Sequence, residues 1–182
     1  PEASRASRVM IDIDTSHSRL GFLARHLMVS KVRGQFNEFS GTITVGENIL
    51  DSGAVVTAKV DSITTGDTQR DGHLRSGDFF EVDTHPELTY TSTHVVAQKG
   101  SSFTVRGDLT IKGVTKEIEL EVELEGIGHN PMRNAQVVAF TATGEINRKD
   151  FGLTWNVALE AGGVLVSDKV KITLDVSAIK QA

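Results

Sequence analysis

Hydrophobic and polar residues alternate with a period of two along much of the chain, which is the pattern of strands that bury one face. In residues 117–125, Ile118, Leu120, Val122 and Leu124 alternate with five glutamates. This alternation is typical of antiparallel sheets, in which one face packs on the core and the other meets water. The same pattern predicts further strands at residues 9–13, 39–45, 54–60, 88–96, 103–111, 137–146, 151–159 and 170–176.

Turn residues divide these runs at short intervals, as at Lys112-Gly113 and Gly162-Gly163. Residues 23–31 and 69–80 have apolar spacing compatible with a turn or two of helix. A sheet of about eight strands removes its exposed edges by closing on itself. We therefore predict an all-β fold, an extended antiparallel β-barrel of about eight strands with one or two short helices. Residues 9–182 are expected to form one domain and residues 1–8 a flexible N-terminal segment.

The side chains expected to face the barrel interior are mostly Val, Ile, Ala, Thr and Gly, and the whole chain has a single Trp and a single Tyr. Such small side chains leave space inside a barrel of this size. Strands of about ten residues rise roughly 3.3 Å per residue, which gives a lumen on the order of 30 Å long before tilt. The sequence thus predicts a long apolar cavity that stores or carries a long apolar lipid and does no chemistry.

Composition limits the other partners of the chain. Its 182 residues carry a net charge of -5 and include no cysteine. The negative charge argues against nucleic acid and gives no reason to expect attraction to anionic membranes. The lack of cysteine excludes disulfides and thiolate metal sites. No apolar run follows Arg5 and Arg8, which favours a cytoplasmic protein and leaves an exported mature form open.

Motifs for metal or catalytic sites are incomplete. Residues 67–78 resemble a calcium-binding EF-hand loop at Asp67, Asp71 and Gly72, but Asp78 stands where a bidentate Glu is needed and a strand pattern precedes the loop. The six histidines form no local zinc motif, and the chain has no nucleophile elbow or phosphate-binding loop. We predict no catalytic residue, no metal site and no cofactor.

Two clusters place basic residues beside apolar ones, at residues 25–33 and 70–80. The mouth of a lipid-binding barrel has this mixed character. If both clusters meet at one rim, they could bind a phosphate or a polarised carbonyl through charge-assisted hydrogen bonds while the lipid tail lies inside. A solvated turn with two core residues is the alternative reading of the first cluster.

Both clusters belong to a series of motifs that includes Asp78-Phe79-Phe80 and Asn147-Arg148-Lys149-Asp150-Phe151-Gly152. The series also covers residues 13–18, 22–36, 62–66, 70–76, 86, 90–92 and 107–115. Through these motifs the chain resembles the YceI-like family of polyisoprenoid-binding, lipocalin-like proteins over nearly its whole length. The resemblance implies a barrel whose pore binds isoprenoid chains of the quinone or prenyl-phosphate type without known catalysis. It also leaves a homodimer open.

The resemblance and the alternation together give a set of candidate residues. The predicted lumen residues are Phe22, Met28, Val29, Phe36, Leu74, Phe80, Phe140, Leu153 and Trp155. The predicted head-group residues are Arg25, His26, Lys31, Arg70 and His73. Tyr90 departs from the family, which often has Phe there, and its hydroxyl needs a partner if the ring points inward.

Two other functions stay open at this point. One is an enzyme that acts on an isoprenoid or other lipid held in the barrel, with His26 or His73 as general base. The other is a structural or stress-response module whose core is filled by side chains.

Overall fold

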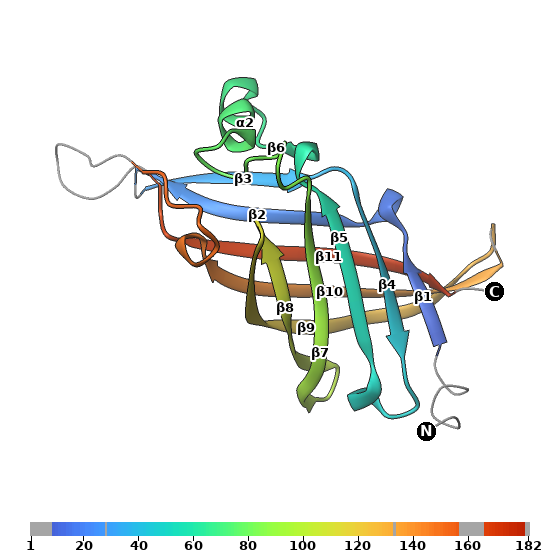
Figure 1. The fold of residues 1–182 in the computed structure, drawn as a ribbon. Coiled ribbons are helices and arrows are strands. Elements are labelled where there is room, and N and C mark those ends of the chain that lie inside the picture. The colour runs from blue at the N-terminus through green and yellow to red at the C-terminus, as the bar shows by residue number, and fades with distance from the viewer. Residues whose placement is uncertain (1–8, 28, 133, 157–165, 181–182) are drawn as a thin grey trace.

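Eight antiparallel strands close into a barrel in the computed structural model, which describes residues 9–27, 29–132, 134–156 and 166–180 (Figure 1). The ring consists of β1 (Val9–Ile13), β4 (Phe39–Val45), β5 (Gly53–Lys59), β7 (Glu87–Lys99), β8 (Ser102–Ile111), β9 (Val114–Asn130), β10 (Ala135–Asn147) and β11 (Lys169–Lys180). Pairing of β1 with the end of β11, where Ile11 lies opposite Lys180, closes the ring. Closure satisfies the backbone groups that an open sheet would leave at its edges.

Three further strands extend the sheet beyond the ring. They are β2 (Arg19–His26), β3 (Ser30–Phe36) and β6 (Ile63–Thr64). β2 pairs with residues 171–175 of β11, just before the part of β11 that pairs with β1. The helix α2 (Thr68–Arg75) lies beside β6 at this end of the sheet (Figure 1). No helix in the described ranges is long and apolar enough to cross a membrane.

Short 3-10 turns complete the described structure. They are η1 (Thr15–His17), η2 (Ile49–Asp51), η3 (Val60–Ser62) and η4 (Arg148–Phe151). η1 connects β1 to β2, η2 connects β4 to β5, and η3 connects β5 to β6.

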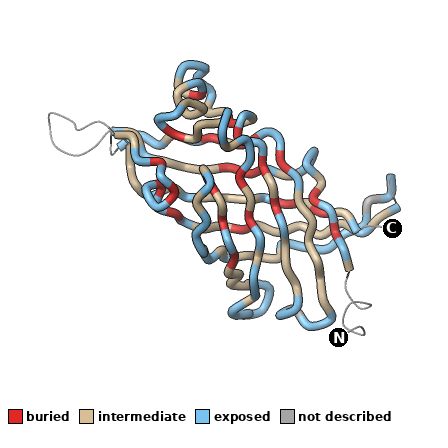
Figure 2. The backbone as a smooth tube through the Cα atoms, in the orientation of Figure 1, coloured by how far each residue is buried: buried red, intermediate tan, exposed pale blue. Residues whose placement is uncertain are grey.

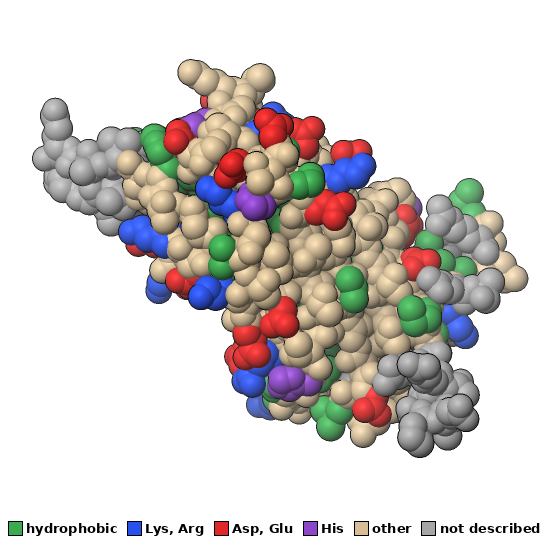
Figure 3. Space-filling model, viewed as in Figure 1, with side chains coloured by type: hydrophobic (Ala, Val, Ile, Leu, Met, Phe, Trp, Pro, Cys, Tyr) green, Lys and Arg blue, Asp and Glu red, His purple; other side chains and the backbone are tan. Residues whose placement is uncertain are grey.

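Buried and more exposed residues follow one another along the strands, in keeping with the predicted alternation (Figure 2). On β10, Ala142 and Ile146 face the interior and are buried, while the intervening Glu145 is exposed. On the outer face of the neighbouring strands, Arg106 donates to Glu119 over 2.7 Å. Charged side chains lie mainly around the margins of the face shown in Figure 3. The barrel wall therefore separates a polar outside from an apolar inside.

The prediction of a helix at residues 23–31 was wrong. These residues form the end of β2, the turn and the start of β3. Side chains at Phe22 and Ala24 follow the period of two and face the cavity, and this burial outweighs the helical spacing of Leu23 and Leu27. The helix expected within residues 69–80 is present as α2, where the Asp67 carboxylate accepts the N–H of Arg70 at 3.0 Å.

The strand predicted at residues 151–159 is also wrong for its described part. Phe151 ends the turn η4, and Gly152 follows it with a φ of 76°, a conformation that favours glycine. Residues 153–156 form no strand, and residues 157–159 lie outside the described residues. Phe151 is only 1% exposed, so its apolar character reflects core packing rather than a strand.

Candidate functional site

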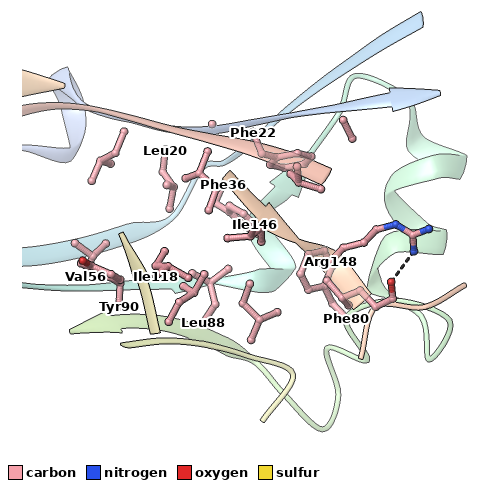
Figure 4. A pocket seen from close by; sticks show the side chains of 18 of the residues that line it. Leu20, Phe22, Phe36, Val56, Phe80, Leu88, Tyr90, Ile118, Ile146 and Arg148 are labelled. Atoms are coloured by element: carbon pink, nitrogen blue, oxygen red, sulfur yellow. Dashed lines mark hydrogen bonds between the residues drawn. The ribbon is translucent and has the colours of Figure 1, made fainter. Parts of the chain in front are cut away.

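An apolar cavity of about 170 Å³ lies inside the barrel (Figure 4). Its wall is made by apolar side chains from the strands and from the segment that follows α2. Prominent members are Leu20, Phe22, Phe36, Val56, Phe80, Leu88, Ile118, Leu120, Ile146 and Leu174. Among the described lining residues, Tyr90 and Arg148 are the two with polar side-chain groups. The cavity can thus solvate hydrocarbon, but it offers little to a charged group.

Aromatic rings narrow this cavity. Phe36 lies between Phe22 and Phe80, with ring centroids 5.8 Å and 6.2 Å away. An engineered apolar cavity of about 150 Å³ in another protein holds one benzene molecule. A chain of several isoprene units therefore requires the lining side chains to move outward.

Two glycines let aromatic rings approach the backbone of the barrel wall closely. A Cβ on Gly34 would stand 2.2 Å from the ring of Phe22, and one on Gly107 would stand 2.6 Å from the Tyr90 hydroxyl. A glycine in a strand often marks such a close approach. Both rings are part of the cavity lining.

The Tyr90 side chain is 8% exposed, and its hydroxyl has no hydrogen-bond partner among the described residues. Figure 4 places Tyr90 at the end of the cavity away from Arg148. Burial, and to a smaller degree the Asp108 carboxylate, raises the pKa of Tyr90 to about 12. The ring therefore points inward, as the sequence allowed, but the partner that a buried hydroxyl normally finds is not provided by these residues.

Titration of Tyr90 tests this environment directly, because it is the single tyrosine of the chain. The folded protein should release the phenolic proton near pH 12 and the unfolded chain near pH 10. Stability present below pH 10 should then fall by about 2 to 3 kcal/mol as the pH rises from 10 to 12. Absorbance at the tyrosinate band, with Tyr90→Phe as blank, measures the midpoint. A native midpoint near pH 10 would show that the hydroxyl is solvated.

Arg148 is 3% exposed and lies at the other end of the cavity (Figure 4). Its guanidinium donates to the carbonyl oxygens of Leu153 at 2.5 Å, Trp155 at 2.9 Å, Ser167 at 2.9 Å and Val166 at 3.3 Å. The planar fork of an arginine suits several acceptors at once. These bonds join the segment after η4 to the segment before β11, and both segments contribute cavity-lining residues.

The charge of Arg148 is only partly balanced. Burial lowers the pKa of Arg148 from its ordinary value, and the Asp168 carboxylate, 3.7 Å away, acts in the opposite direction. Because its N–H groups already donate to main-chain carbonyls, Arg148 holds these two segments together and is not free to bind an anionic ligand. We call this arrangement the clasp.

Five of the nine predicted lumen residues line the cavity: Phe22, Phe36, Leu74, Phe80 and Leu153. Phe140 packs on the core two residues beyond Ala142 and opposite Val176, outside the lining.

Trp155 is also outside the lining, because its ring packs on His73 and Phe79, with centroids 4.6 Å and 5.4 Å away. Val29 is 76% exposed in the turn between β2 and β3, so its prediction as a lumen residue was wrong. Met28 lies outside the described residues.

None of the five predicted head-group residues is among the described residues that line the cavity. Arg25 and Lys31 are exposed on the outer face of the β2–β3 hairpin, and His26 pairs with Val166 through the backbone. Arg70 donates to the hydroxyl and carbonyl oxygens of Thr65, at 2.7 Å and 2.9 Å. His73 contacts the Asp78 carboxylate through Nε2 at 2.8 Å. Arg70 and His73 are therefore engaged by local partners.

The segment that resembles a calcium loop contains the helix α2. Asp67 caps α2, and the Asp71 carboxylate accepts from the N–H and hydroxyl of Thr65 at 2.8 Å and 2.5 Å. Within the described ranges, no group of three or more His, Asp or Glu side chains could hold a metal ion. The acidic side chains of this loop are used in its own hydrogen bonding.

Comparison with protein families gives a match that spans most of the chain. The model described as the YceI-like domain matches residues 12–178. A UPF0312 protein of Staphylococcus aureus is 43% identical over 161 residues, which are 87% of this chain and 90% of that protein.

Solved structures with the same fold come from several organisms. The YceI protein of Campylobacter jejuni superposes with a TM-score of 0.71 and is 28% identical, over 87% of this chain and 90% of that one. BcnA of Burkholderia cenocepacia gives a TM-score of 0.77 at 22% identity, over 91% and 98% of the two chains. A polyisoprenoid-binding domain from Saccharophagus degradans gives 0.70 at 17% identity, over 95% and 99%. The last two likenesses concern the fold alone.

Proposed function

The chain belongs to the YceI-like family, and from that premise we propose that it binds, stores or transports a long-chain isoprenoid lipid in the barrel cavity without catalysis. The observation that carries this proposal is the apolar cavity, whose wall includes no charged group free to contact a ligand among the described residues. The solved structure named as a polyisoprenoid-binding domain has the same fold, which supports the choice of guest.

The chemistry of the wall favours a hydrocarbon guest with a head group held outside. Burying apolar surface contributes about 25 cal/mol per Å², less the cost of ordering a flexible chain. A phosphate inside the cavity would lose its hydration without gaining a cation, since Arg148 is engaged by carbonyls. We propose a polyprenyl phosphate or an isoprenoid quinone as the guest. Arg25 and Lys31 remain the proposed contacts for its head group.

The placement of the histidines supports binding over catalysis. A general base must lie within hydrogen-bond reach of the proton it removes. His73 contacts Asp78 and packs against Trp155, and neither His73 nor His26 is among the described lining residues. A base in either position would therefore not be in contact with a lipid in the cavity.

Uptake of defined lipids tests the proposed function. A polyprenol of about eight isoprene units should bind one per chain and, at about 100 times its Kd, raise the stability by about 2.7 kcal/mol, which corresponds to roughly 5 to 10 °C in Tm. A straight-chain alcohol of similar length should stabilise the protein less, because it lacks the methyl branches that pack against the side chains of the cavity wall. If neither lipid changes the Tm or the fluorescence of Trp155, the proposal fails.

A further inference from the structure

The turn between β2 and β3 exposes apolar side chains at one end of the barrel. Leu27 is 43% exposed and Val29 is 76% exposed. The cavity lining reaches Ala24 on β2 and Val166, which forms a backbone bridge with His26. The exposed turn therefore lies just beyond the last cavity residues of β2, at the end of the barrel opposite the β9–β10 turn (Figure 1).

Three cations flank this turn on the outer face of the hairpin. Arg25 stands directly opposite Lys31 in the antiparallel register, and Arg33 follows two residues along β3. Like charges in directly opposite positions destabilise a strand pair. None of the three forms an ion pair with a described residue, although the whole chain has a net charge of -5. Within the part of the chain that the structure describes, these three charges contribute no ion pair to the fold, and an anionic partner would balance them.

Leu27 occupies an unfavourable position for a leucine. Its φ is 55°, a left-handed conformation that glycine and asparagine adopt at lower cost. A large apolar side chain here is both strained and exposed to water. The chain keeps an apolar group where folding alone would favour a small or polar one.

We propose that this turn docks the protein on an anionic lipid bilayer. Leu27 and Val29 would enter the interface, and Arg25, Lys31 and Arg33 would contact lipid phosphates. We name these five residues the docking tip. The net charge of -5 does not prevent docking, because charges beyond a Debye length of about 8 Å are screened while the tip cations touch the surface.

Asp168, the acidic residue nearest in sequence to Val166 and its backbone bridge to β2, does not oppose this docking. Asp168 follows the segment that bridges to β2, and it already pairs with Lys149 at 3.3 Å. The purpose of docking rests on the proposed function, because docking would bring the end of the cavity to a membrane that supplies or receives the lipid. Docking itself can be measured without any lipid in the cavity.

Flotation with vesicles tests the docking tip. Wild-type protein should float with phosphatidylcholine vesicles that contain about 30% phosphatidylglycerol, and should not float with pure phosphatidylcholine or at 1 M salt, where the Debye length is about 3 Å. Arg33→Gln should weaken binding about fivefold. Leu27→Asn should weaken it about tenfold, because it removes the apolar group while it suits the left-handed backbone.

A matched control comes from the other end of the barrel. Ile127 is 68% exposed on β9, beside Glu125 and away from the docking tip. Ile127→Asn should leave flotation unchanged. Failure of the wild-type protein to bind anionic vesicles would overturn the proposal. So would binding of both Leu27→Asn and Arg33→Gln with the same affinity as the wild-type protein.

The two proposals fail in different ways. Uptake of polyprenol from detergent by wild type and Leu27→Asn, with no flotation of wild type, would overturn docking and leave lipid binding intact. Flotation of wild type without polyprenol uptake would overturn lipid binding and support docking.

Discussion

Replacing Ala142 by Trp is expected to reduce uptake of long isoprenoids at least tenfold while the barrel stays folded. Ala142 is 6% exposed and lines the cavity from β10, between Val122 of β9 and Leu174 of β11. An indole ring at this position would take up much of the cavity of about 170 Å³ that the prenyl chain must enter and widen. Overpacking lowers the free energy of unfolding by about 1 to 3 kcal/mol, and a barrel of normal stability stays folded after such a loss.

The matched control is Thr143→Trp, which adds the same ring to the outer face of the same strand. Circular dichroism and urea unfolding show whether each variant is folded, and polyprenol titration measures uptake. Ala142→Leu, which adds less bulk, should reduce uptake of long polyprenols more than of short ones. Undiminished uptake by folded Ala142→Trp would mean that the lipid does not lie along the barrel axis.

Replacing Arg148 by Met is expected to lower the free energy of unfolding by about 3 to 5 kcal/mol. The variant removes the donor of the Leu153, Trp155 and Ser167 carbonyls, while the Val166 carbonyl still accepts from the Asn156 side-chain amide at 2.8 Å. For a chain of this size the loss corresponds to roughly 6 to 20 °C in Tm. Urea and thermal unfolding measure it.

Lys149→Met provides the control for charge. Lys149 is half exposed and pairs with Asp168 at the surface, so its loss should cost at most about 1 kcal/mol. Arg148→Lys should recover only part of the stability, because a lysine keeps the charge but not the planar fork. Equal stability of Arg148→Met and wild type would show that the carbonyls find other donors, and the clasp would be disproved.

Much of the barrel could be predicted because its signal is local. Alternating residues in β1 and β4 gave strand bounds identical to those observed. The β2–β3 hairpin was missed because Leu23 and Leu27 repeat at helical spacing. Its strand structure depends on distant contacts, such as the pairing of Phe22 with Ile172 of β11.

Some cavity residues were predictable because a large apolar side chain lies on the inward face of a strand, as at Phe22 and Phe36. Others, such as Leu74 and Leu153, lie outside the strands, and Leu74 came from a family motif. Phe140 packs on the core but is not among the lining residues, and the alternation of residues along its strand does not distinguish these two positions.

The sequence does not reveal the clasp at Arg148, although Arg148 lies in one of the motifs that the chain shares with the family. Its acceptors are main-chain carbonyls 5 to 19 residues away, and any residue type provides a carbonyl. The sequence indicates that an inward Tyr90 ring needs a partner for its hydroxyl. Whether that partner is present depends on which atoms surround the hydroxyl, and the sequence does not show them.

The most direct test of the account is native mass spectrometry of the gently purified chain, with organic extraction to identify whatever is bound. Lipid binding in the barrel predicts a complex heavier than the bare chain by the mass of one isoprenoid lipid, and the same lipid in the extract. Repeated recovery of the bare chain alone, with no prenyl lipid in any extract, would contradict it.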